Sequence, residues 1–265
     1  WLIEDIGFDG FRYDFVKGYG VWLIDAIMER LYKKENNERY SPFGVGEYWS
    51  DDTTVIKWLK ETNSGSDNPI SAFDFDLRGR LKDLCDQYGF SLKRLADPGT
   101  LLTEKLSHWA VTFVENHDIV RDNPVVNDKM LAYAFILTHE GYPCVFWQDY
   151  FNWALAGSNG PNGIDALIIV HENYAGGKTS VLYCDDDLYI MQRNGYGKQK
   201  GLVFVLNNGG SWKGHYVTTA WKNHRFIPLA WYGKDDSVPE SKHSNDTAGT
   251  DFWAPPRGYV VYAPE

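Results

Sequence analysis

Residues 10–15 read GFRYDF, and residues 21–33 read VWLIDAIMERLYK. The first stretch is a short β-like run with an acidic side chain near its end. The second repeats Leu23, Ile27 and Leu31 at helical spacing, which gives one face of a helix an apolar surface. The sequence therefore predicts a strand over Gly10–Phe15 and a helix over Val21–Lys33. A strand that leads into a helix is the unit from which parallel, helix-covered sheets are built.

The same alternation of strands and helices continues to residue 171. The further predicted strands are Phe43–Tyr48, Ala72–Phe75, Ala110–Val114 and Pro143–Phe146. The predicted helices that follow them are Thr53–Glu61, Leu77–Tyr88, Lys129–Thr138 and Ile164–His171. This alternation implies parallel strands that are covered by helices.

After Gly176 and Gly177 the pattern becomes β-rich, with runs separated by Gly, Asn and Asp turns. The predicted strands of this part are Val181–Tyr183, Leu188–Arg193, Gly201–Leu206, His215–Thr219 and Gly258–Tyr262. Strong helical periodicity does not return. The sequence therefore predicts an α/β part over residues 1–176 and an antiparallel β domain over residues 177–265.

Composition excludes several classes of function. The formal charge of −10 argues against general affinity for nucleic acid or anionic membranes, since both need clustered Lys and Arg. Apolar runs stay well short of the ~20 residues that a membrane-spanning helix needs. Cys85, Cys144 and Cys184 are far apart and lack metal-binding or redox spacing, so we expect reduced cysteines in the core.

Three polar clusters stand at the carboxyl ends of predicted strands: RYD at 12–14 with KG at 17–18, GEYW at 46–49, and ENHD at 115–118. In a βα-barrel, this edge is where active sites are built. Each acid taken alone is more often a helix N-cap or a solvated loop residue than a catalytic group. The three together favour one pocket, because each has a basic or imidazole neighbour suited to controlling its ionisation.

Cleavage of glycosides explains a need for paired carboxyl groups. A retaining enzyme uses an ionised carboxylate as nucleophile and a protonated carboxyl as acid, about 5–5.5 Å apart. Asp14 suits the nucleophile, because the guanidinium of Arg12 favours its charged form. Glu47 suits the acid, because aromatic neighbours and nearby like charges raise a carboxyl pKa.

The stretches GFDGFRYDFVKGY (7–19), GVGEYW (44–49) and FVENHD (113–118) resemble three signature regions of the α-amylase family of glycoside hydrolases. The tripeptide KGY (17–19) and the stretch AYAFILTHEGYPCVFWQDY (132–150) are most similar to the plant and archaeal branch of α-amylases. The resemblance implies that Asp14 is the nucleophile, Glu47 the acid/base, and Asp118 a third carboxylate that holds sugar hydroxyls.

The resemblance also implies roles for neighbouring residues. Arg12 and His117 would line the cleavage subsite, and Lys17 and Trp49 would contact sugar on the leaving-group side. Gly18 would give its backbone carbonyl to a structural calcium, whose other ligands lie in the preceding part of the family's chain. Calcium takes six to eight oxygens, so a single carbonyl forms no site alone. A glycine that ends a tight strand–helix turn is an equal explanation.

In fold, the resemblance implies the last five βα units of a (β/α)8 TIM barrel, followed by the β domain. The family's first three strands have no counterpart before Trp1. An open five-stranded segment exposes sheet edges and half a core. We therefore expect an N-terminal segment, on the same precursor or on a separate chain, to complete the barrel, and residues 1–265 alone to be neither stable nor active.

The leading hypothesis is retaining endo-hydrolysis of α-1,4-glucosidic bonds in starch- or glycogen-type polysaccharides. A transglycosylase of the same family shares the covalent intermediate, so the motifs do not separate the two. A non-catalytic glucan-binding relative is a third alternative, although such a protein is expected to lose one of the carboxylates. We expect an extracellular location, because polymeric starch is usually met outside the cell.

Overall fold

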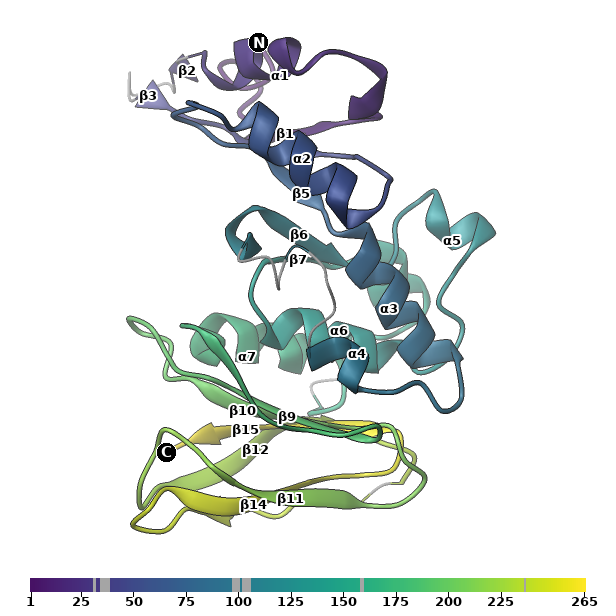
Figure 1. Ribbon diagram of the computed structural model, residues 1–265, viewed down its shortest axis with the longest axis vertical. Helices are drawn as coiled ribbons and strands as arrows, with labels where there is room; N and C mark the ends of the chain where they lie inside the picture. The colour runs from purple at the N-terminus through teal and green to yellow at the C-terminus, as the bar shows by residue number, and fades with distance from the viewer. Residues whose placement is uncertain (31, 34–38, 97–100, 102–105, 158–159, 236) are drawn as a thin grey trace. The chain divides into compact units, whose positions relative to one another are not determined.

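The computed structural model describes residues 1–30, 32–33, 39–96, 101, 106–157, 160–235 and 237–265 (Figure 1). Its contacts divide the chain into two compact units. The first unit contains residues 1–77 and 99–112, and the second contains residues 78–98 and 113–265. The boundary near residue 176 stays a prediction beside this division. Within the described ranges, no helix is long and apolar enough to cross a membrane.

The first unit is built on a parallel sheet. Its strands are β1 (Gly10–Tyr13), β4 (Phe43–Gly46), β5 (Ser71–Phe73) and β6 (Ala110–Phe113), of which the last extends one residue into the second unit. Neighbours in the order β1-β4-β5-β6 pair in parallel, and β7 (Tyr142–Cys144) comes next in the strand order. These are the five strands that the sequence predicted.

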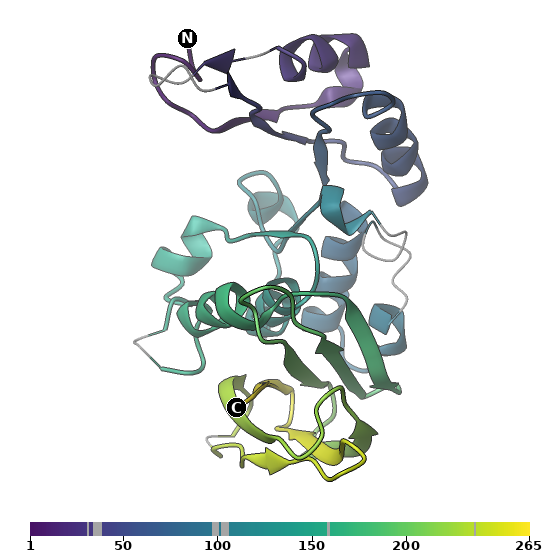
Figure 2. The same cartoon turned by 90° about the vertical axis from the view of Figure 1, so that its left-hand side faces the viewer.

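Two helices cover the sheet of the first unit: α1 (Val21–Met28) and α2 (Asp52–Thr62) (Figure 2). Each helix has buried apolar residues: Ile24 and Met28 in α1, and Val55, Trp58 and Leu59 in α2. The core that they form contains Tyr13, Val16, Ile24, Met28, Val55, Trp58, Leu59, Ile70 and Ala72. Asp51 caps α2 by accepting a hydrogen bond from the Thr54 backbone N–H (3.1 Å). Short elements complete the unit: η1 (Val16–Gly18), β2 (Tyr32–Lys33), β3 (Arg39–Tyr40) and η2 (Ser107–Trp109).

The prediction of a helix over Val21–Lys33 was wrong at its end, because α1 stops at Met28 and Tyr32 lies in β2. Leu31 lies outside the described residues. Tyr32 is buried, and its hydroxyl donates to the Ile27 carbonyl (3.1 Å). The chain therefore leaves the helix before Tyr32, although the apolar spacing by itself would continue it.

The strand predicted to reach Phe75 also ends early. Asp74 follows β5, and its carboxylate accepts the Leu77 backbone N–H (2.9 Å). This bond caps α3 (Phe75–Asp86), so the helix begins two residues before its predicted start at Leu77. Sequence periodicity located both elements, and the capping contact decided the boundary between them.

The helical part of the second unit contains α4 (Lys93–Ala96), α5 (Ile119–Asp122), α6 (Lys129–Thr138), η3 (Gln148–Asn152) and α7 (Ile164–Tyr174), beside most of α3 (Figure 2). Helix α6 has the predicted bounds, and all of its residues are buried. A helix that is apolar on every side is enclosed by protein. Its last turn reaches the β-rich part through His139, which meets the Tyr189 hydroxyl (3.0 Å).

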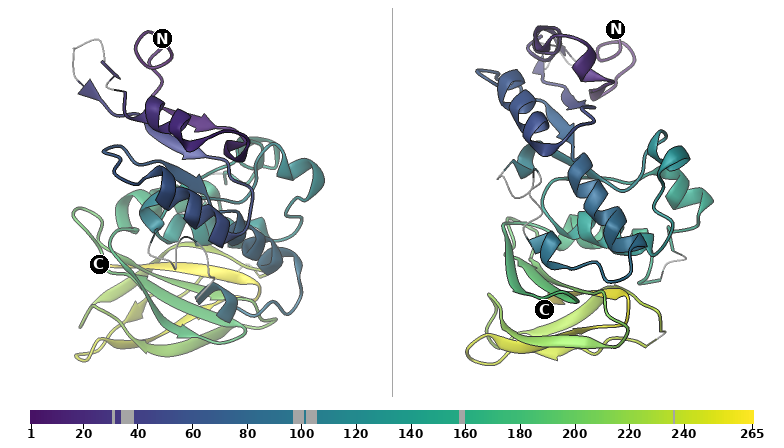
Figure 3. Two further views of the ribbon diagram at one scale, coloured as in Figure 1. Left: turned by 45° about the horizontal axis from the view of Figure 1, so that its top comes forward. Right: turned by 45° about the vertical axis from the view of Figure 1, so that its right-hand side comes forward.

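The β-rich part of the second unit is a sandwich of a six-stranded and a two-stranded sheet (Figure 3). The larger sheet, in the order β13-β12-β15-β10-β9-β8, contains Lys242–His243, Arg225–Tyr232, Gly258–Pro264, Leu202–Asn207, Leu188–Arg193 and Thr179–Cys184. The smaller sheet pairs β11 (Lys213–Thr218) with β14 (Gly249–Ala254). Its Val217 and Phe252 pack on Val205 and Val260 of the larger sheet.

Three strands of this sandwich, β12, β13 and β14, were absent from the sequence prediction. Strand β12 contains Pro228, which cannot donate to a sheet, and the register of its pairing shifts between Pro228 and Ala230. Strand β14 begins at Gly249, where a Cβ would meet the Tyr216 hydroxyl at 2.0 Å. In the sequence, proline and glycine are both typical of turns. In the structure, the shift of register accommodates Pro228, and Gly249 allows the close approach of Tyr216.

The expectation that all three cysteines lie in the core was partly wrong. None of them is in a disulfide. Cys85 is buried, and burial raises the pKa of its thiol to about 12. Cys144, by contrast, is exposed, because it lies in β7 at the end of the strand order. Cys184 is half-buried.

Candidate active site

Two of the predicted carboxylates, Asp14 and Glu47, follow neighbouring parallel strands of the first unit. The backbone of Glu47 bonds on both sides of Asp14: its N–H donates to the Tyr13 carbonyl (2.8 Å), and its carbonyl accepts from the Val16 N–H (3.2 Å). These bonds fix the ends of β1 and β4 against each other. Parallel pairing thus brings together two acids that are 33 positions apart in the chain.

Arg12 joins the two carboxylates. One of its terminal nitrogens lies 2.6 Å from Glu47 Oε1 and 3.4 Å from Asp14 Oδ1. Sequence analysis placed Arg12 beside Asp14, whereas its shorter contact is with Glu47. The Glu47 side chain is 10 % exposed, and that of Asp14 is 77 % exposed. One acid is therefore enclosed and the other is open to an incoming ligand.

The chain turns sharply directly after Asp14. Phe15 has a φ of 45°, a left-handed conformation that is strained for a bulky side chain. Its carbonyl accepts the Gly18 N–H (2.9 Å), which closes the turn of η1. A Cβ on Gly18 would meet the Phe15 ring at 2.6 Å, so a glycine is needed where this ring packs. Strain of this kind is concentrated at functional sites.

The residues on both sides of Glu47 pack against the Trp58 ring of α2. A Cβ on Gly46 would lie 2.3 Å from the Trp58 ring, so only glycine lets the ring pack under the end of β4. Tyr48 packs on the same ring, with centroids 5.7 Å apart. The glycine of the GEYW stretch therefore has a packing role that fixes the backbone next to the acid.

Lys17 and Trp49, predicted to share the leaving-group side, lie together. Lys17 Nζ donates to the Trp49 carbonyl (3.1 Å). The Trp49 ring is 50 % exposed and stacks on Phe75, with centroids 5.2 Å apart and planes at 11°. Phe75 and Phe73 were not among the predicted site residues; the Phe73 ring lies 5.6 Å from the Arg12 guanidinium. The available signal was the aromatic pair in the stretch AFDF at 72–75.

His117 and Asp118 belong to the second unit. Asn116, whose role sequence analysis did not assign, forms an Asx turn: its Oδ1 accepts the backbone N–H groups of Asp118 (3.1 Å) and Ile119 (2.8 Å). This turn starts α5. His117 Nε2 lies 3.3 Å from Asp118 Oδ2. Both side chains are partly exposed, so they are accessible to a ligand.

The comparisons with known proteins agree on one family. The chain is 32 % identical to an α-amylase of Geobacillus stearothermophilus over 236 residues, which cover 82 % of this chain and 40 % of the relative. It is 30 % identical over 262 residues to the probable α-amylase 2 of Arabidopsis thaliana, covering 85 % and 55 %. The chain belongs to the α-amylase family. No protein-family model matches it.

Solved structures of the α-amylase family confirm the fold. The α-amylase of Geobacillus thermoleovorans in complex with acarbose matches with a TM-score of 0.70 at 19 % identity, covering the whole of this chain and 62 % of that one. A cyclomaltodextrin glucanotransferase also gives a TM-score of 0.70, at 20 % identity. The chain therefore has the partial parallel barrel and the β domain of α-amylases. It spans about half the length of the curated relatives cited above.

The calcium prediction finds limited support in these residues. Across the described ranges, no group of three or more His, Cys, Asp or Glu side chains is placed to hold a metal ion. The Gly18 carbonyl would supply one oxygen of the six to eight that calcium takes. The described residues therefore provide no acidic cluster that would complete a calcium site with this carbonyl. The role of Gly18 stays a prediction, as do the roles of the other site residues.

Proposed function

We propose that this chain forms part of a retaining enzyme that hydrolyses α-1,4-glucosidic bonds within starch- or glycogen-type polysaccharides. Asp14 is the nucleophile, Glu47 is the acid/base, and Asp118 is the third carboxylate. The observation that carries the proposal is the contact of one Arg12 nitrogen with both Asp14 and Glu47.

This contact limits the distance between the two carboxyl groups. Because Asp14 Oδ1 and Glu47 Oε1 lie near the same nitrogen, they are at most about 6 Å apart. Retaining enzymes hold their carboxyl groups about 5–5.5 Å apart, whereas inverting enzymes need about 6.5–9.5 Å to admit a water. The short distance between these two oxygens is compatible with the spacing of a retaining enzyme and supports the proposal.

In the proposed reaction, the Asp14 carboxylate attacks the anomeric carbon while Glu47 protonates the leaving glycosidic oxygen. Glu47 then takes a proton from water, which attacks the same carbon and releases Asp14. Arg12 stabilises the carboxylate charge between the two steps. The half-exposed Trp49 ring suits an apolar sugar face, and the nearby Lys17 ammonium can bind sugar hydroxyls. His117 and Asp118 would hold the hydroxyls of the sugar that is cleaved.

We also propose that an N-terminal segment completes the barrel. The support is the length of the relatives, together with the strand order, in which β1 and β7 are the two ends of the sheet. A sheet with two open ends invites further pairing. Calcium binding through Gly18 belongs to the same proposal, since the further ligands would come from that segment.

The location of the protein is a separate proposal. Curated relatives include the α-amylase 3 of Arabidopsis thaliana, named chloroplastic, and an Escherichia coli α-amylase named cytoplasmic. Relatives of this chain are therefore found in more than one compartment. Secretion remains our proposal for this chain, because its proposed substrate is a polymer.

The test uses the full-length protein that carries this chain. Asp14→Asn should lower kcat by several orders of magnitude on maltooligosaccharides and aryl glycosides alike, because both need the nucleophile. Glu47→Gln should lower kcat strongly on maltooligosaccharides and far less on an activated aryl glycoside, whose leaving group needs no proton. Asp67→Asn changes an exposed carboxylate of the same unit and is the matched control. Equal losses on both substrates in Glu47→Gln would refute its role as the acid.

Product analysis separates the alternatives. An NMR spectrum taken early in the reaction should show α-anomeric products from a retaining enzyme, and β-anomeric products would exclude retention. New, longer oligosaccharides would identify a transglycosylase. Binding of maltooligosaccharides without any turnover would identify a non-catalytic glucan-binding protein.

A further inference from the structure

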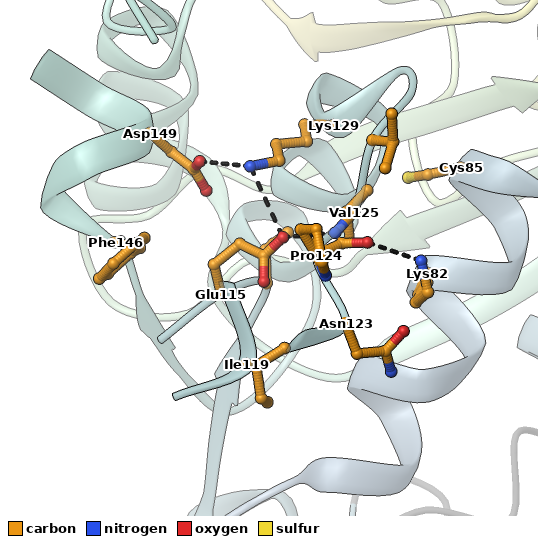
Figure 4. Close-up of polar contacts among 12 residues, drawn as sticks. Lys82, Cys85, Glu115, Ile119, Asn123, Pro124, Val125, Lys129, Phe146 and Asp149 are labelled. Atoms are coloured by element: carbon orange, nitrogen blue, oxygen red, sulfur yellow. Dashed lines mark hydrogen bonds and ion pairs between the residues drawn. The ribbon is translucent and has the colours of Figure 1, made fainter. Parts of the chain in front are cut away.

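Four charged side chains are buried together in the second unit, next to the segment that carries His117 and Asp118. Figure 4 shows Glu115, Lys129 and Asp149 of this cluster. Arg78 and Lys129 are 4 % and 8 % exposed, and Glu115 and Asp149 are fully buried. Two positive and two negative charges balance within the cluster. Buried charges are costly unless they are paired, so the arrangement needs an explanation.

Arg78 bonds to both ends of the segment 116–124. Its Nε donates to the Val114 carbonyl (3.0 Å), directly after β6. One of its terminal nitrogens donates to the Asn123 carbonyl (2.6 Å), directly after α5, and to Glu115 Oε2 (3.1 Å). A single guanidinium therefore holds the chain where it enters this segment and where it leaves it.

Glu115 connects the same two ends from within the chain. Its Oε1 accepts the Val125 backbone N–H (2.5 Å), and Lys129 Nζ lies 3.5 Å from the same oxygen (Figure 4). The segment 116–124 is thereby closed twice at its base, by Arg78 and by Glu115. His117 and Asp118 lie inside the closed segment, with the Asx turn of Asn116 beneath them.

The surroundings hold the base of this segment in place. Lys82 Nζ donates to the Pro124 carbonyl (2.6 Å). Lys129 pairs with Asp149 (2.5 Å), whose other oxygen accepts the Tyr133 hydroxyl (2.6 Å). Figure 4 shows that Lys82, Lys129 and Asp149 come from different elements. Glu115 is therefore held between two cations and has little freedom to turn away.

Stability alone does not account for this arrangement. A buried ion pair contributes little net stability, because desolvation of the charges offsets their attraction, and apolar residues often serve as well. What Arg78 and Glu115 supply is directional bonding to main-chain groups. Such bonds fix the geometry of the segment, whereas apolar packing is less directional.

We propose that Arg78 and Glu115 are positioning residues, which fix the orientation of Asp118 by bonding the backbone at both ends of segment 116–124. The inference rests on the proposed function, in which Asp118 acts on the bound sugar. Displacement of a reacting group by about 1 Å can cost about 100-fold in rate. Arg78 and Glu115 would thus act on the rate without contact with the substrate.

The first test is Arg78→Met in the full-length protein. We expect kcat on maltooligosaccharides to fall by about 10- to 100-fold, with little change in KM. The matched control is Arg193→Met, which also removes a buried arginine of the second unit. Arg193 donates to the Thr138 carbonyl (3.0 Å) and the Gly177 carbonyl (2.7 Å), away from segment 116–124. It should lower the melting temperature and leave kcat of the folded enzyme nearly unchanged.

The second test is a double-mutant cycle with Asp118→Asn, read on an activated aryl maltooligosaccharide. If Arg78 acts through Asp118, then Arg78→Met should cause little further loss in the Asp118→Asn background, because the group that it positions is already disabled. Equal fold-losses in both backgrounds, or a kcat loss no larger than that of Arg193→Met, would overturn the inference. Full activity of Asp118→Asn would instead refute the proposed function at this residue.

Arg78→Lys keeps the test decisive if Arg78→Met does not fold. A lysine keeps the positive charge beside Glu115 but cannot hold both carbonyls in the fixed fork of a guanidinium. Its kcat should lie below that of the wild type, with the same dependence on Asp118 in the cycle. A wild-type kcat in Arg78→Lys would show that the charge suffices and that the double closure does not position Asp118.

Discussion

We expect the second unit to lose stability in acid, because His139 is buried in its neutral form. Burial lowers the pKa of this histidine from 6.5 to about 3; the bond to the Phe135 carbonyl opposes this effect, and the charge of Arg193 adds to it. The ring stacks on Phe135 with centroids 3.7 Å apart. Its Nδ1 lies 2.8 Å from the Phe135 carbonyl, and its Nε2 lies 3.0 Å from the Tyr189 hydroxyl. The neutral ring fits both bonds, since Nδ1–H donates and Nε2 accepts.

The sign and size of the effect follow from proton binding. Below pH 6.5 the unfolded chain binds a proton at this position, and the folded chain does not until the pH approaches 3. The free energy of unfolding therefore falls as pH falls through this window, by up to about 1.4 kcal/mol per pH unit. Between pH 6.5 and 4.5 the loss from His139 is about 2 kcal/mol, because the unfolded histidine is only half protonated at pH 6.5. This is a large part of a typical domain's stability.

The assay is urea unfolding of the full-length protein between pH 4 and 7, followed by tryptophan fluorescence. The comparison is His139→Phe, which keeps a ring between Phe135 and Tyr189 but cannot bind a proton. The variant should be less stable at pH 7, because the Tyr189 hydroxyl loses its acceptor. Below pH 6.5 the free energy of unfolding of the variant should also fall less steeply with pH. The difference in slope should correspond to the uptake of about one proton on unfolding. Parallel pH profiles for the wild type and the variant would refute the reasoning.

Three further predictions concern the first unit and the whole chain. Gly46→Ala should lower stability by about 1–3 kcal/mol, because its Cβ would lie 2.3 Å from the Trp58 ring; thermal melting checks this, and an unchanged melting temperature would contradict it. Trp49→Ala should raise KM for maltooligosaccharides about 2- to 10-fold, since it removes the exposed ring that stacks on Phe75; steady-state kinetics checks this, and an unaltered KM would exclude sugar stacking there. Residues 1–265 expressed alone should melt without cooperativity and should not hydrolyse starch, because the ends of the parallel sheet remain open; a cooperative, active monomer would contradict the need for a further segment.

Local patterns predicted most of the elements of this chain. Helix α6 and strand β9 have the predicted bounds, and each is a continuous run in which every residue is buried. Boundaries set by distant contacts were missed. Helix α1 ends at Met28 although the apolar spacing continues, and β12 contains a proline where the register of the sheet shifts.

In the candidate site, too, some features follow from local sequence and others depend on contacts between distant residues. The motifs around Asp14, Glu47 and Asp118 are contiguous in sequence, so their chemistry could be inferred from neighbouring residues. The position of Arg12 closer to Glu47 than to Asp14 could not, since parallel pairing of β1 and β4 creates that contact across 35 positions. The closure of segment 116–124 by Arg78 was hidden for the same reason.

The sequence by itself determined which carboxylates this protein has and the strand–helix order that places them at strand ends. Those features depend on residue type and on short-range spacing. Only the tertiary structure decided how the acids are held: by an arginine shared between two strands, and by a buried pair that closes the segment of Asp118. The physical reason is that hydrogen bonds and ion pairs depend on distances in space, which the fold sets between residues far apart in the chain.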